Sequence, residues 1–142
     1  MTIRTCRSII EGKETLSCAA TLSVAEAASL MREHRTGAII IVAEDGRLAG
    51  IFTERDALFR VLAAERDPSA TRMSEVMTPQ PQTLTADEPF LRALRVMHEG
   101  RFRHLPVVEQ GRPIGIVSVR DALDEDLAEL RFDLEQREEA RE

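Results

Sequence analysis

Two short stretches of the chain carry the same reactive side chains in the same order. Residues 50–58, GIFTERDAL, return as residues 115–123, GIVSVRDAL, with six of nine positions identical. Each stretch holds a hydroxyl, an arginine and an aspartate: Thr53, Arg55 and Asp56 in the first, Ser118, Arg120 and Asp121 in the second. At a helix N-terminus, amide N–H groups and the helix dipole can receive a phosphate. A neighbouring carboxylate can accept hydrogen bonds from both hydroxyls of a ribose, so the pattern indicates a site for a phosphorylated sugar.

The same residues also have a purely structural interpretation. Thr53 and Asp56, like Ser118 and Asp121, stand three residues apart, as the hydroxyl and acid of a helix capping box do. On this interpretation each aspartate only starts a helix and binds nothing. It leaves unexplained the arginine before each aspartate, and the use of Asp where Glu suits a capping box better. The sequence alone leaves both interpretations open.

The elements that would position these motifs are repeated as well. An apolar helical stripe after Ser23 recurs after Pro89 at a constant offset of 66 residues: Val24, Ala27, Ala28 and Met31, then Phe90, Ala93, Leu94 and Met97. Apolar runs at 38–43 and 104–109 predict buried strands. Turn signals at 44–47 and 110–112 predict return strands at 48–52 and 113–117. A helix is expected to follow each motif, the first over 54–64.

The predicted fold is therefore α/β (α+β), with two β-α-β-β-α repeats. Neither repeat can cover its own sheet on both faces, so we expect them to pack face to face about a pseudo-two-fold axis. We place the first repeat, with an N-terminal lead-in over 1–15, at residues 1–70, the second at 71–130 and a polar helix end at 131–142. The break falls at Asp67-Pro-Ser-Ala-Thr71. The prolines of 77–83 then prevent a helix in the lead-in of the second repeat.

Composition excludes several classes of function. The 142 residues are 43% hydrophobic and 31% charged, which is typical of a soluble globular domain. No run approaches the roughly 18 apolar residues of a membrane span, and the start has no signal-peptide core, so we expect a cytoplasmic location. A formal charge of −6 argues against nucleic acid and anionic membranes as partners. Cys6 and Cys18 are expected to be free thiols.

Nothing in the sequence predicts an enzyme. It contains no CxxC or HExxH motif, no glycine-rich phosphate loop and no recognisable nucleophile elbow. His34 and His98 lack the spacing of metal ligands, so no metal site is expected. The two aspartates stand in separate copies of one motif, which favours binding over acid–base catalysis.

These features together resemble a tandem pair of cystathionine-β-synthase (CBS) domains, a Bateman module, over roughly Ser8 to Leu127. The specific marks are the two Gly-Ile-x-(Thr/Ser)-x-x-Asp motifs, residues 76–79 (VMTP) and residues 103–107 (RHLPV). The resemblance implies a regulatory module that binds AMP, ADP or ATP, with S-adenosylmethionine or NAD as further candidates, and that needs no cofactor. It also implies a homodimer that signals to an unidentified protein in trans. The alternative is a ligand-independent dimerisation or scaffold module.

Carried over by position, the resemblance implies two clefts between the repeats. One would be formed by Thr53, Arg55 and Asp56 against the second lead-in, with Thr78, Pro79 and Thr83. The other would be formed by Ser118, Arg120 and Asp121 against residues 10–14, which lack a Met-Thr-Pro sequence, so the clefts are not expected to be equivalent.

Arg103 and His104 would lie near the ligand phosphates, where the first repeat has the uncharged Gly37 and Ala38. Arg103 could serve either cleft. The structural alternatives are a surface ion pair for Arg103 and a hydrogen-bonded core position for His104.

The last helix carries leucines at steps of 4, 3 and 4, at positions 123, 127, 130 and 134, followed by a fully polar end. This narrow seam is typical of helix association. It either packs on its own domain or contributes to a dimer, and we expect the second.

Overall fold

The computed structural model describes residues 4–141, apart from the side chains of residues 125–127. Its strands form two sheets. The first sheet has the order β1 (Ser17–Ala19), β2 (Ala38–Val42), β3 (Leu48–Thr53), β4 (Thr78–Pro79). The second has the order β5 (Leu84–Thr85), β6 (His104–Glu109), β7 (Arg112–Ser118). In each sheet a short parallel strand precedes an antiparallel hairpin.

Helices surround these sheets. They are α1 (Cys6–Ile10), α2 (Val24–Glu33), α3 (Glu54–Asp56), α4 (Met73–Val76), α5 (Phe90–Gly100) and α6 (Asp124–Arg141). A π-helical segment, η1 (Ala57–Leu62), continues α3, and a 3₁₀ turn, η2 (Val119–Leu123), leads into α6. The helix predicted over 54–64 therefore starts where expected, but it widens after one turn and ends at Leu62.

Local chemistry explains where these elements begin and turn. The Ser23 hydroxyl caps α2 by accepting a hydrogen bond from the Glu26 amide at 3.1 Å. The hairpin turns use residues with positive φ, Gly46 at 84° in one and Gln110 and Gly111 at 52° and 79° in the other. Both turns fall where the sequence predicted them.

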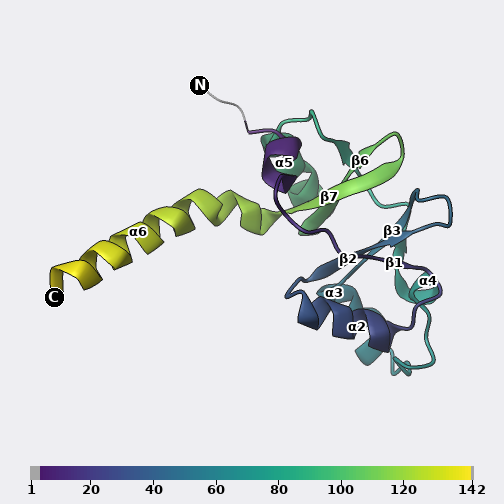
Figure 1. Cartoon of the computed structure of the whole chain (residues 1–142). Coiled ribbons are helices and arrows are strands. Elements are labelled where there is room, and N and C mark those ends of the chain that lie inside the picture. The colour runs from purple at the N-terminus through teal and green to yellow at the C-terminus, as the bar shows by residue number, and fades with distance from the viewer. Residues whose placement is uncertain (1–3, 142) are drawn as a thin grey trace.

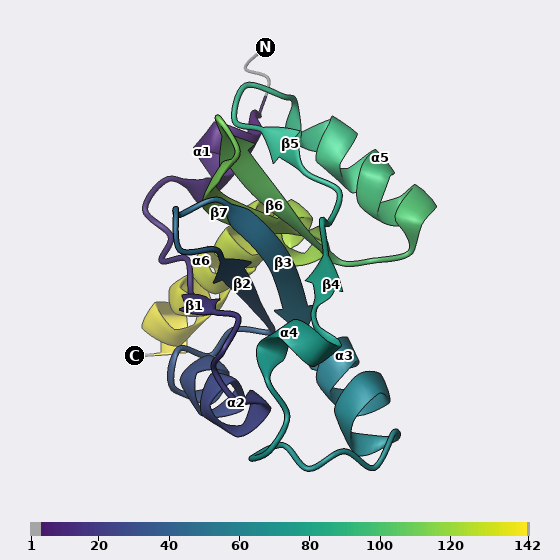
Figure 2. The ribbon, with the colours of Figure 1, turned by 90° about the vertical axis from the view of Figure 1, so that its right-hand side faces the viewer.

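The two repeats stack on one another as the sequence predicted (Figure 2). Strands β3 and β6 lie between them, while α5 lies at one end of the stack and α2 and α3 at the other. Each repeat has a core of its own, built from the buried face of its helices and the inner strands. This arrangement brings the two motif ends, after β3 and after β7, to the junction of the repeats.

The lead-in segments cross between the repeats. Helix α1 packs in the core of the second repeat, where the Cys6 amide donates to the Glu88 carbonyl at 2.9 Å. Conversely, β4 pairs with β3, with Thr78 opposite Ile51 and Pro79 opposite Gly50. Each motif is therefore faced by the lead-in segment of the other repeat.

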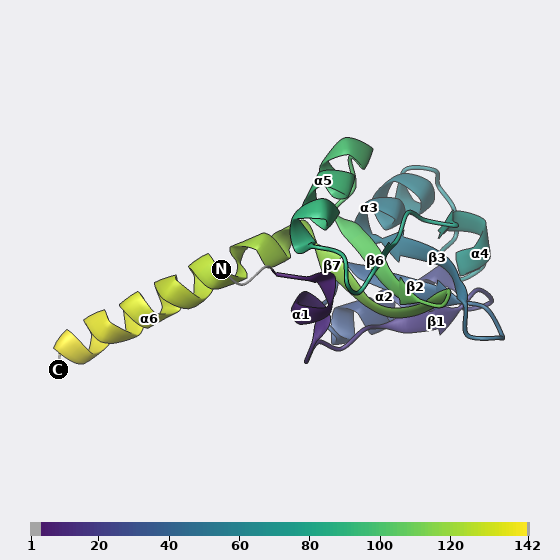
Figure 3. The same ribbon diagram turned by 90° about the horizontal axis from the view of Figure 1, so that it is seen from above.

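Helix α6 extends away from the stacked repeats (Figures 1 and 3). Leu130, Phe132 and Leu134 on it are about half exposed, at 52%, 60% and 49%. The side chain of Leu127, a member of the predicted seam, lies outside the described residues. No helix within residues 4–141 is long and apolar enough to cross a membrane.

The two cysteines are free thiols, one associated with each core. Cys6 is buried in the core of the second repeat, and Cys18 on β1 packs against the core of the first. Burial raises the pKa of the Cys18 thiol to about 11. Burial also raises the pKa of the Cys6 thiol, and the nearby Glu88 carboxylate raises it further.

Candidate ligand-binding clefts

A cavity of about 350 Å³ lies between the first motif and the second repeat. Five predicted site residues line it together: Thr53, Arg55, Asp56, Thr78 and His104. The sequence had not indicated its other lining residues: Ile51, Gln80, Pro81, Gln82, Gly100 and Phe102. Gln80, Pro81 and Gln82 reach this cavity because the second lead-in segment crosses over β3. We refer to this cavity as the first cleft.

Asp56 in the first cleft forms a capping box with Thr53. Its Oδ2 accepts hydrogen bonds from the Thr53 amide at 2.9 Å and the Thr53 hydroxyl at 3.2 Å. The Asp56 amide in turn donates to the Thr53 hydroxyl at 3.3 Å. The capping interpretation of the motif is therefore correct for one carboxylate oxygen. The other oxygen, Oδ1, lies 3.5 Å from Nε of Arg60.

Arg60 connects this carboxylate to the lead-in segment. Its Nη1 donates to the carbonyls of Val76 at 3.2 Å and Met77 at 3.0 Å. Because Thr78 follows directly, Arg60 fixes the opposing wall of the cleft relative to Asp56. The spacing of Arg60 four residues after Asp56 was the only sequence signal for this role.

The second motif borders a smaller cavity, of about 190 Å³, which we call the second cleft. Ser118, Arg120, Asp121 and His104 line it, together with residues of the first lead-in and of the turn after α2. Asp121 is capped like Asp56, because its Oδ2 accepts a hydrogen bond from the Ser118 amide at 2.7 Å. Its Oδ1 instead forms an ion pair with Nζ of Lys13, which comes from the opposite wall.

His104, at the start of β6, lines both clefts. Burial lowers the pKa of its imidazole below the ordinary 6.5, and the Arg103 guanidinium lowers it further. The carboxylates of Glu54 and Asp121 act in the opposite direction. The imidazole is thus a partly buried base at the junction of the repeats.

Three predicted site residues lie elsewhere. Pro79 is exposed and pairs through β4 with Gly50, and neither Pro79 nor Thr83 lines either cleft among the described residues. Arg103 lines a third cavity of about 730 Å³, on the face that bears α2 and the start of α6, and a further cavity of about 280 Å³ that it shares with Thr53, Arg55 and His104. The strand pairing of β4 turns Pro79 away, which the sequence pattern did not reveal.

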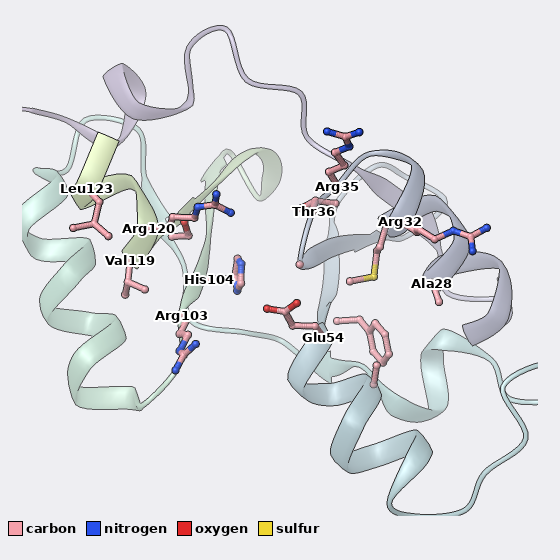
Figure 4. Close-up of a pocket in the computed structure, with 15 residues that line it drawn as sticks. Ala28, Arg32, Arg35, Thr36, Glu54, Arg103, His104, Val119, Arg120 and Leu123 are labelled. Atoms are coloured by element: carbon pink, nitrogen blue, oxygen red, sulfur yellow. The ribbon is translucent and has the colours of Figure 1, made fainter. Parts of the chain in front are cut away.

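Four arginines surround this third cavity: Arg32, Arg35, Arg103 and Arg120. Figure 4 shows Glu54 and His104 facing one another, with the arginines around them and not converging on one point. None of the four has a carboxylate within ion-pair distance among the side chains that the structure describes. The lining of this cavity therefore combines four guanidinium groups with the Glu54 carboxylate.

Comparison with known proteins agrees with the fold and the duplicated motif. The family model described as "CBS domain" matches residues 8–63 and again residues 73–128. The chain belongs to the CBS-domain family and carries two such domains in tandem.

Individual proteins support this assignment. The CBS domain-containing protein CBSCBSPB1 of Arabidopsis thaliana is 38% identical over 112 residues, which cover 78% of this chain but only 20% of the plant protein. A CBS-domain protein of Burkholderia ambifaria MC40-6 is 32% identical with a TM-score of 0.79, covering 87% of this chain and 94% of that one. The CBS domain pair of protein MJ0100 is 27% identical with a TM-score of 0.79, covering 90% and 99%. Its structure contains 5′-methylthioadenosine and S-adenosyl-L-methionine.

Proposed function

We propose that this chain is a regulatory module that binds an adenosine-containing nucleotide, AMP, ADP or ATP, in the first cleft. The observation that carries the proposal is the assembly of Thr53, Asp56, Thr78 and His104 around one open cavity from both repeats. Its volume of about 350 Å³ lies within the usual range of roughly 300–1,000 Å³ for small-molecule sites, and the 190 Å³ of the second cleft lies below it.

The capping role of Asp56 is compatible with ligand binding. An ionised carboxylate has two oxygens and about four acceptor positions. Oδ2 holds the Thr53 amide, while Oδ1 is bound only loosely, at 3.5 Å from Arg60. A ribose hydroxyl would donate to Oδ1, and Arg55 and His104 would face the phosphate end. The adenosine compounds bound by protein MJ0100 support this class of ligand.

Calorimetric titration of AMP, ADP, ATP, S-adenosylmethionine and NAD tests the proposal. We expect wild type to bind one adenine nucleotide per chain, and Asp56→Asn to weaken that binding at least tenfold. The amide of this variant would keep an acceptor for the Thr53 N–H but lose the negative charge. Asp121→Asn is the matched control and should bind as wild type does. A 2′-deoxynucleotide should bind more weakly than the ribonucleotide.

Thermal unfolding separates this function from a ligand-independent scaffold. A nucleotide at a hundred times its Kd should stabilise the native chain by about 2.7 kcal/mol. If no nucleotide raises the melting temperature of wild type, the aspartates act only as structural residues and the ligand-independent scaffold remains.

The wider features of the module belong to the same proposal. It acts as a binding protein and not an enzyme, in the cytoplasm, and signals to a protein partner in trans. The repeats divide near residue 70, with the polar helix end beginning near residue 131. Ligand binding would shift the relative tilt of the repeats, which the partner recognises.

We also propose a homodimer to which α6 contributes. Leu130 and Leu134 on it are 52% and 49% exposed, so the described part of this chain leaves about half of each side chain uncovered. The range 124–141 holds eight acidic residues and three arginines. In a dimer, the negative charge of α6 from one copy would complement the four arginines that line the third cavity of the other copy.

A further inference from the structure

Lys13 and Asp121 join the two walls of the second cleft. Lys13 belongs to the first lead-in segment and Asp121 to the second motif, and they are 108 residues apart in sequence. We propose that this ion pair keeps the second cleft closed to nucleotide, so that only one of two similar sites binds. The inference rests on the proposed function, since it concerns which cleft the same ligand uses.

Both oxygens of Asp121 are already engaged within the protein. Oδ2 accepts from the Ser118 amide at 2.7 Å, and Oδ1 pairs with the Lys13 ammonium. A ribose hydroxyl would need the place of Lys13. The side chain of Asp121 is only 8% exposed, so little room remains beside the ammonium group.

Matching the two clefts residue by residue shows why only one is closed. A Cβ on Gly50 would meet Met77, and a Cβ on Gly115 would meet Ile10, so Met77 and Ile10 are equivalent. The residue three positions after Met77 is the neutral Gln80, which lines the first cleft. The residue three positions after Ile10 is the cation Lys13, which lines the second cleft.

A second difference holds the lysine in place. Oδ2 of Asp124 lies 3.7 Å from Nζ of Lys13, which therefore faces two carboxylates. Asp124 follows Asp121 by three residues, and the residue at the same distance after Asp56 is Phe59. The first cleft thus lacks a cation at the position of Lys13 and an acid at the position of Asp124, and its Asp56 carboxylate meets only the more distant Arg60, at 3.5 Å.

The ion pair can be removed by one substitution at its outer partner, because the Lys13 side chain is 41% exposed while that of Asp121 is 8% exposed. Replacement of Lys13 by Gln, the residue of the first cleft, removes the charge and keeps a polar chain of similar length. We expect Lys13→Gln to raise the stoichiometry of nucleotide binding from one to two per chain. In Lys13→Gln/Asp121→Asn it should return to one.

Calorimetry of these variants distinguishes the possible failures. One site in both wild type and Lys13→Gln overturns the closed cleft but leaves the proposed function intact. Weaker binding in Lys13→Gln also overturns it, because Lys13 would then be a ligand contact. No binding in any variant overturns both proposals. No site in wild type and one in Lys13→Gln would support the closed cleft and remove the first cleft as the binding site.

A measurement without nucleotide tests the ion pair itself. Lys13 is the only lysine in the sequence, so lysine labelled with ¹³C and ¹⁵N gives a single Cε–Nζ signal in the NMR spectrum. We expect Asp121→Asn to shift this signal and Asp56→Asn to leave it in place. An unchanged signal in Asp121→Asn would show that the ion pair is absent and would overturn the inference. Thermal unfolding of Lys13→Gln establishes that the variant is folded.

Discussion

His104 is the one predicted site residue that lines both clefts. The equivalent residue of the first repeat is Ala38, so the junction of the repeats holds a single imidazole and not a symmetric pair. Folding lowers the pKa of His104, which means that the native state favours the neutral form. The imidazole is therefore a source of pH dependence in the stability of the whole module.

We expect the contribution of His104 to stability to be fully present above its unfolded pKa of about 6.5 and to be lost as the pH falls below it. The unfolded chain takes up the proton first, so acid favours unfolding. Urea unfolding at pH values of about 7.5 and 5.5 measures this, with His104→Gln as the comparison. The variant should lose less stability than wild type over that interval. An equal loss in both proteins would show that other groups dominate.

At the scale of single residues, the sequence indicated the polar residues of the two motifs but not the side chains that bind to them. The hydroxyl, arginine and aspartate of each motif were predictable because one short pattern sets their spacing and their position at a helix start. Arg60 and Lys13 were not, because their contacts depend on how distant segments cross. Asp56 caps its helix through Oδ2 and also lines a cleft, so the capping role does not decide between the two sequence interpretations, and ligand binding remains a proposal.

A glycine in β3 determines how closely the second lead-in segment can approach that strand. At Gly50 in β3 a Cβ would lie 2.6 Å from Sδ of Met77 and 2.8 Å from the carbonyl oxygen of Thr78. The second lead-in can cross the sheet so closely only because that side chain is absent. The distance between β3 and β4 therefore sets the width of the first cleft.

We expect Gly50→Ala to destabilise the chain by about 1–3 kcal/mol, the usual cost of an extra methyl group in a packed site. It should also weaken nucleotide binding, because the backbone of Thr78 must move. Gly37→Ala is the control: its Cβ would meet only the flexible carboxylate of Glu54, at 3.1 Å. Urea unfolding and calorimetry measure both effects. A control as damaged as Gly50→Ala would contradict this explanation.

The repeated order of amphipathic helix, hairpin strands and following helix was predictable, since stripe, strand and turn signals recur at a nearly constant offset. The widening of the helix after the first motif was not, because the sequence of η1 has an ordinary helical pattern. The crossing of α1 into the core of the second repeat was also hidden. Its few apolar residues, Ile9 among them, gave no sign of which core they join.

At the scale of the molecule, α6 is the part that the two repeats do not explain. Leu130 and Leu134 lie on one face of it, and Phe132, exposed to 60%, lies on the opposite face at 100° per residue. A helix that leaves such leucines in water gains from covering them with a second copy.

We expect wild type to be a dimer in light scattering, and Leu130→Glu/Leu134→Glu to shift it to monomer. Glu is a good helix former, so the helix itself should persist. Phe132→Glu is the matched control, since it places a negative charge on the other face, and it should remain a dimer. A dimer that survives the leucine changes would place the interface elsewhere on the chain.

The two thiols differ in how they should react with an alkylating reagent. With a pKa of about 11, only about one Cys18 group in a thousand is ionised near pH 8 even where reagent can reach it. Cys6 lies fully covered in the other core. Alkylation of Cys6 therefore waits for the core of the second repeat to open, whereas the partly buried Cys18 reacts slowly through its small thiolate fraction, so the labelling rate of Cys6 reports the opening of that core.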